Sequence, residues 1–178
     1  MKHQSILAGA SLILLASIIT SAAGPQAKVA KVSPQVMAKN VGELTPEEEE
    51  QFSEGSEATI ERVCIACHPF ENIIKTRRTV REWNDQVTTM AQRGAPGTEP
   101  DFALIKKYLT RYYGIVRVNT ATAEELSSVL GLPPKVAAAV VDYRTAHGRF
   151  ADLAALEKVD GVDKAKLEDQ PEALRFDL

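Results

Sequence analysis

Residues 62–70 read Arg-Val-Cys-Ile-Ala-Cys-His-Pro-Phe, and they contain both cysteines of the chain, Cys64 and Cys67, with His68 directly after the second. Cys-x-x-Cys-His is the attachment signature of c-type haem. Two thiols one helical turn apart can each form a thioether with a haem vinyl group, and the next residue then offers an imidazole to the iron. The stretch therefore predicts one covalent haem c, bound by Cys64 and Cys67, with His68 as the proximal iron ligand.

A Cys-x-x-Cys pair has two other uses, as a redox disulfide and as half of a zinc site. A zinc site needs two further ligands, and the only other histidines are His3 and His147. A thioredoxin-like motif would stand beside a strand–helix pattern, which we do not find in the sequence. Haem is therefore the favoured interpretation, with the disulfide and the metal site as alternatives.

The first residues of the chain predict export. Lys2 and His3 precede an apolar run over residues 6–19, and small residues follow at 21–23, as in a signal peptide over residues 1–23. An uncleaved membrane anchor is the alternative, and no other membrane span is expected. We interpret residues 24–44, with Pro25, Pro34 and Gly42, as a flexible linker. The expected location is periplasmic or extracellular.

The charge balance of the 178-residue chain is slightly acidic, with 21 Lys and Arg against 24 Asp and Glu, and a net charge of −3. This balance argues against a bulk affinity for nucleic acid or for an anionic membrane. About 130 residues remain after the linker, enough for one medium domain or two small ones.

Residues 45–114 are expected to form a small three-helix domain around the haem. Thr45 and Glu48 form a capping box that opens the first helix. A second helix over residues 79–92 has an apolar stripe that ends at Met90. Met90 is either part of the core or the distal iron ligand; we interpret it as the ligand, with His147 as a competing donor. A third helix follows Glu99.

This region resembles class I-type monohaem cytochromes c, in particular the haem subunits that partner periplasmic dehydrogenases. The resemblance implies that Cys64 and Cys67 bind haem, that His68 and Met90 are axial, and that a redox protein such as a dehydrogenase or a terminal acceptor is the partner. No catalytic residues and no enzyme activity are expected. If Met90 were not a ligand, an open iron position would allow gas binding or peroxidatic chemistry. The residues that match are Ile74, Arg77, Arg78, Thr79, Trp83, Val87, Met90, Arg93, Gly94, Tyr108, Leu109, Tyr113 and Gly114.

Residues 115–178 contain an internal repeat of 30 positions. Leu126 and Gly131 recur as Leu156 and Gly161, and each unit is expected to form helix, tight glycine turn, helix. Thr122 and Glu125 predict a capping box, and Pro134 predicts the start of the partner helix.

The repeat resembles a tandem helix-hairpin-helix domain, like that of the exported DNA receptors of natural competence. The resemblance implies contacts from the hairpin turns and nearby lysines to DNA phosphates, at Gly131, Lys135, Gly161 and Lys164. Pro133 and Asp163 stand where the family has a second hairpin glycine, and the region has 8 basic against 11 acidic residues. A protein-docking role is therefore favoured, as in the helix-hairpin-helix extrinsic subunit of photosystem II.

Together these patterns predict an all-α protein with a cytochrome c domain followed by a degenerate helix-hairpin-helix domain. The expected function is single-electron transfer with docking to a protein partner. The alternative is a haem-bearing DNA-binding or tethering protein at the cell surface. A haem sensor is a third possibility, although the chain shows no output domain.

Overall fold

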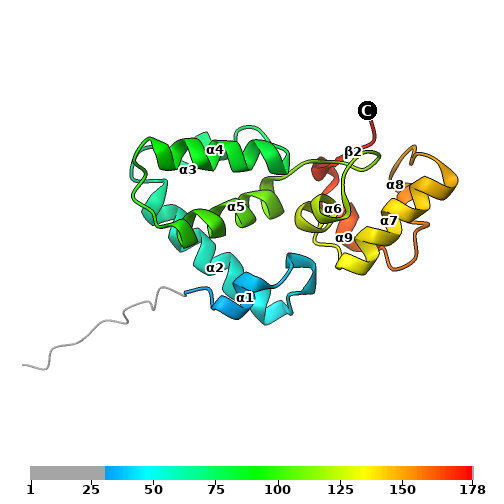
Figure 1. The fold of residues 1–178 in the computed structure, drawn as a ribbon, viewed down its shortest axis with the longest axis horizontal. Helices are drawn as coiled ribbons and strands as arrows, with labels where there is room; N and C mark the ends of the chain where they lie inside the picture. The colour runs from blue at the N-terminus through cyan, green and yellow to red at the C-terminus, as the bar shows by residue number, and fades with distance from the viewer. Residues whose placement is uncertain (1–30, 178) are drawn as a thin grey trace, which may run out of the picture.

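The structure is a computed structural model that describes residues 31–177. The predicted signal peptide (1–23) and the first part of the predicted linker (24–30) lie outside the described residues. Two groups of helices lie side by side (Figure 1): the N-terminal module, residues 31–114, and the C-terminal module, residues 115–177. None of the described helices is long and apolar enough to cross a membrane.

The N-terminal module is built on three helices, as predicted: α2 (Pro46–Val63), α4 (Val80–Gln92) and α5 (Glu99–Tyr113). Helices α2 and α4 both pack on α5. Their shared core contains Phe52, Ile60, Trp83, Ile105 and Leu109. A short helix, α3 (Phe70–Ile74), which the sequence analysis did not predict, connects α2 to α4.

Four of the described helices, α2, α4, α5 and the helix that begins at residue 123, start with the same device. A threonine side chain caps the helix, and a carboxylate three residues later accepts from the backbone N–H of that threonine, which satisfies two N–H groups at the helix start. The pairs are Thr45–Glu48, Thr79–Glu82, Thr98–Asp101 and Thr122–Glu125. The predicted helix starts at residues 45 and 122 are therefore confirmed.

The linker prediction does not hold over residues 33–44. This segment contains α1 (Pro34–Ala38) and a 3-10 helix, η1 (Val41–Glu43). Val36 and Val41 are buried in the N-terminal core, and the ammonium group of Lys107 donates to the carbonyl oxygens of Val36, Met37 and Lys39. Buried apolar groups and these hydrogen bonds hold the segment in place.

The C-terminal module repeats a helix–turn–helix unit. Helices α6 (Ala123–Leu130) and α7 (Pro134–His147) form the first unit, and α8 (Leu153–Leu156) and α9 (Lys164–Glu168) form the second. Leu126 and its repeat partner Leu156 are both fully buried in one core. A 3-10 helix, η2 (Pro171–Ala173), follows α9.

The all-α prediction is correct except for one small parallel sheet. Strand β1 (Val116–Arg117) begins the C-terminal module, and β2 (Leu174–Arg175) ends it. Val116 pairs with Leu174, and Arg117 pairs with Arg175. The pairing joins segments more than fifty residues apart, which a local pattern does not reveal.

Candidate nucleic-acid interface

The first hairpin of the C-terminal module is the turn over residues 131–133, between α6 and α7. Gly131 has φ +66°, a left-handed conformation that favours glycine. Gly131 and Leu132 are buried. The turn that the resemblance assigns to phosphate contact is therefore largely withdrawn from solvent.

The first hairpin also has few backbone donors. Pro133 and Pro134 carry no N–H, and the N–H of Gly131 donates to the carbonyl oxygen of Ser127 at 2.9 Å. Leu132 has the one remaining N–H of this turn, and that residue is only 2% exposed. A buried amide cannot reach a phosphate without movement of the groups around it.

The second hairpin, residues 160–163, lies between α8 and α9 and is more open. Gly161 has φ +83°, and Asp160, Gly161 and Asp163 are exposed. The N–H groups of Gly161 and Asp163 have no acceptor among the described residues. The carboxylate of Asp163 caps α9 by accepting from the N–H of Lys166 at 3.4 Å.

The second hairpin touches the start of α7. A Cβ atom at Gly161 would stand 3.0 Å from Cγ2 of Val136, so the first turn of α7, with the exposed Lys135, adjoins this hairpin. Lys135, Lys158 and Lys166 are exposed, and no acidic side chain of the described residues forms an ion pair with them. These three lysines, together with residues 160–163, are called the open face below.

Lys164 differs from those three lysines. Its ammonium group lies 3.4 Å from Glu157 Oε2 and 3.5 Å from Glu168 Oε1. The hydrogen bond to Glu157, with the charges of both glutamates, raises the pKa of Lys164. The predicted contact residues therefore separate: Lys135 and Gly161 lie together at the surface, Gly131 is buried, and the charge of Lys164 is balanced within the module.

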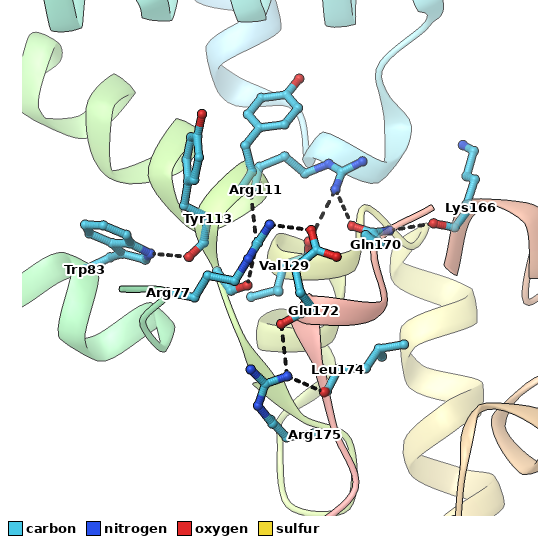
Figure 2. A network of polar contacts seen from close by, with 12 residues as sticks. Arg77, Trp83, Arg111, Tyr113, Val129, Lys166, Gln170, Glu172, Leu174 and Arg175 are labelled. Carbon is cyan, nitrogen blue, oxygen red and sulfur yellow. Dashed lines mark hydrogen bonds and ion pairs between the residues drawn. The ribbon is translucent and has the colours of Figure 1, made fainter. Parts of the chain in front are cut away.

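The junction between the two modules is a polar network that the sequence analysis missed (Figure 2). Nη1 of Arg111, on α5, donates to the side-chain oxygen of Gln170 at 2.9 Å and to the carbonyl oxygen of Val129 at 3.3 Å. Arg77 forms an ion pair with Glu172. Residues from both modules thus fix the first hairpin and the segment after α9 to the N-terminal module.

The residues predicted to bind haem line one pocket of the N-terminal module. Cys64, Cys67, His68 and Met90 are all on the wall of a mainly apolar cavity of about 440 Å³ between α2, α3, α4 and α5. Cys64 is half-buried, and burial raises the pKa of its thiol; Cys67 is exposed. Trp83 lines the same cavity, is fully buried, and donates from its indole N–H to the carbonyl oxygen of Tyr113 at 3.0 Å.

Comparison with known families gives one match, which lies in the C-terminal module. Residues 113–175 match the family model described as "Helix-hairpin-helix motif". The match spans both hairpins, and it supports the helix-hairpin-helix prediction for this module. No solved structure matches the chain.

The curated relatives align over a similar length of chain. ComE operon protein 1 of Bacillus subtilis is 39% identical over 54 residues, which is 30% of this chain and 26% of that protein. An uncharacterized protein of Haemophilus influenzae is 40% identical over 62 residues, which is 34% of this chain and 55% of that protein. Endonuclease/exonuclease/phosphatase family domain-containing protein 1 of Rattus norvegicus is 45% identical over 53 residues, 30% of this chain but only 9% of that protein. The chain thus covers a minor part of two of these relatives and about half of the third.

These findings correct the predicted cofactor. The matched family is the helix-hairpin-helix motif, and no match to a cytochrome is among the findings. Among the residues that the structure describes, no group of three or more His, Cys, Asp and Glu side chains is placed to hold a metal ion. On these findings the prediction of haem c and its iron is wrong, and so is the electron-transfer role. The redox partner that was expected with the haem has no support.

Proposed function

We propose that this protein binds DNA through its C-terminal module, without reading base sequence. The single observation that carries the proposal is the helix-hairpin-helix match over residues 113–175, extended by the 39% identity to ComE operon protein 1. The resemblance to competence DNA receptors, drawn from the sequence, agrees with this match. The alternative stated from the sequence, a DNA-binding or tethering protein at the cell surface, is thus favoured over the electron carrier, but without the haem.

The mode of contact that the module supports is with the phosphate backbone. Exposed lysines and hairpin N–H groups bind phosphate oxygens wherever they occur, so they fix position and not sequence. The open face supplies both kinds of donor. The C-terminal module nevertheless has more acidic than basic residues, so few phosphates are contacted, and binding is weak and falls only moderately as salt rises.

The protein acts outside the cytoplasm as a binding protein and not as an enzyme. The predicted signal peptide over residues 1–23 supports export to the periplasm or the cell surface. An exported protein with weak, sequence-independent contacts to DNA is suited to tethering or receiving DNA at the cell surface.

Fluorescence anisotropy with a labelled DNA duplex tests the proposal directly. We expect saturable binding of the purified protein at low salt, and a loss of affinity of about tenfold or more between roughly 50 and 200 mM salt, because few phosphates are contacted. Duplexes of unrelated sequence should bind equally well. Absence of binding at low salt would rule out DNA as the ligand of this module.

A further inference from the structure

We propose that the two hairpins have different partners: the first binds the protein's own N-terminal module, and only the open face around the second is free to contact DNA. The DNA half of this inference rests on the function proposed above. The half that concerns the first hairpin stands on contacts within the chain. It assigns a docking role to a turn that the family resemblance assigns to phosphate.

Gly42 of η1 packs closely against the first hairpin. A Cβ atom at Gly42 would stand 2.2 Å from the carbonyl oxygen of Leu132 and 2.8 Å from that of Gly131. Both obstacles are backbone atoms, which cannot swing aside as a side chain can. Only glycine permits this approach, so the backbone of η1 lies directly against the hairpin.

Polar contacts hold this arrangement on two sides. The hydroxyl of Ser127 lies 2.8 Å from Oδ1 of Asn40 and 2.5 Å from the carbonyl oxygen of Leu132. On another side, a Cβ atom at Gly131 would stand 3.0 Å from the guanidinium of Arg111. Asn40 and Arg111, from separate elements of the N-terminal module, thus enclose the first hairpin (Figure 2 shows Arg111).

The carbonyl oxygens near this turn are occupied as well. Arg111 donates to the carbonyl oxygen of Val129, and Nε2 of Gln170 donates to that of Leu130 at 3.1 Å. Because Pro133 and Pro134 have no N–H and that of Gly131 is already bonded, the buried N–H of Leu132 is the one N–H that this turn could offer to a phosphate. The second hairpin, by contrast, keeps exposed N–H groups and lies beside Lys135.

Hydrogen exchange without DNA tests the docking half. We expect the Leu132 amide of the unaltered protein to exchange slowly, and Gly42→Ala to speed its exchange by about tenfold or more relative to the core amide of Val140, because the added methyl group forces the backbones apart. Glu43→Ala, at an exposed neighbour, is the matched control and should change neither amide. Arg111→Ala should have the same local effect as Gly42→Ala, and it serves if Gly42→Ala does not fold.

Anisotropy and exchange with duplex DNA test the other half. Lys135→Glu is expected to weaken binding by about tenfold and to lower the salt slope, because one phosphate contact is lost and a repulsion is gained. Arg81→Glu makes the same charge change on α4 of the N-terminal module and should leave the affinity within twofold. DNA should slow exchange at residues 160–163 and leave Leu132 unchanged.

The outcomes separate the two claims. If the unaltered protein binds no DNA, the proposed function fails, while the exchange of Leu132 in Gly42→Ala still decides the docking claim. If Leu132 exchanges at the same rate in both Gly42→Ala and Arg111→Ala as in the unaltered protein, the docking claim is wrong. The division between the hairpins would be wrong if DNA slowed the exchange of the Leu132 amide. It would also be wrong if Lys135→Glu left the affinity for DNA unchanged.

Discussion

Arg111 donates from Nη1 to the side-chain oxygen of Gln170 at 2.9 Å, and this bond joins α5 of the N-terminal module to the segment after α9, 59 positions later. The same guanidinium reaches Glu49 on α2 with Nη2 at 3.7 Å. One side chain, 16% exposed, therefore joins α5 to α2 and, through Gln170, to the C-terminal module.

Loss of this connection should destabilise the whole protein. Arg111→Ala removes charge-assisted bonds to Gln170 and Val129, and we expect a loss of about 2 kcal/mol in the free energy of unfolding. Urea unfolding followed by circular dichroism measures it. Arg81→Ala is the control, because Arg81 is highly exposed and has one long ion pair, to Asp85 at 3.8 Å; its effect should stay below about 0.5 kcal/mol.

Asn119 is another polar residue whose loss should destabilise the protein. Its Nδ2 donates to the carbonyl oxygens of Phe150 and Phe176 at 3.0 and 2.8 Å, and its Oδ1 accepts from the N–H of Phe150 at 2.8 Å. Asn119→Ala leaves these groups unpaired, which should lower the free energy of unfolding by about 2 kcal/mol or more. Asn84→Ala, at an exposed site of α4, should change it by less than about 0.5 kcal/mol. Equal effects of the two substitutions would show that Asn119 does not brace the module.

The repeated leucines should contribute comparably. Leu126 and Leu156 are both fully buried in the core of the C-terminal module, so replacement of either by alanine should cost about 2–5 kcal/mol in the free energy of unfolding. Ile65→Ala, at a side chain that is 41% exposed, should cost far less. Thermal unfolding of the three variants compares them, and a small loss at Leu156 alone would mean that the second unit packs loosely.

The capping carboxylates predict a pH dependence. The N–H and hydroxyl of Thr79 donate to Glu82, and they lower the pKa of Glu82 below its ordinary value of 4.5. The carboxylate thus stabilises the fold above pH 4.5, and this contribution is lost as the pH falls through the lowered folded-state pKa. At pH 7 the melting temperature of Glu82→Gln should therefore be lower than that of the unaltered protein. Below the folded-state pKa of Glu82 the two melting temperatures should become similar. A constant difference across this range would mean that the charge of Glu82 is irrelevant.

Local features of this chain were predictable because they depend on neighbouring residues. The Thr–x–x–acid pattern at residues 45 and 122 placed two helix starts, and the 30-residue repeat placed both glycine turns. The approach of Gly42 to Leu132 and the bond from Arg111 to Gln170 were not predictable, since each joins segments that no short-range pattern relates. The haem prediction depended on a short motif, Cys64, Cys67 and His68, whereas the family match covers residues 113–175.

The pairing of β1 with β2 places the first and last residues of the C-terminal module next to each other. The chain therefore enters and ends the module at the same place, where β1 and β2 lie side by side. A unit with adjoining ends can be inserted into a surface loop of an unrelated host without pulling the flanking segments apart. In this protein, deletion of residues 174–177 would remove β2 and leave β1 without its pairing partner. The module would then be destabilised at the point where it joins the N-terminal module.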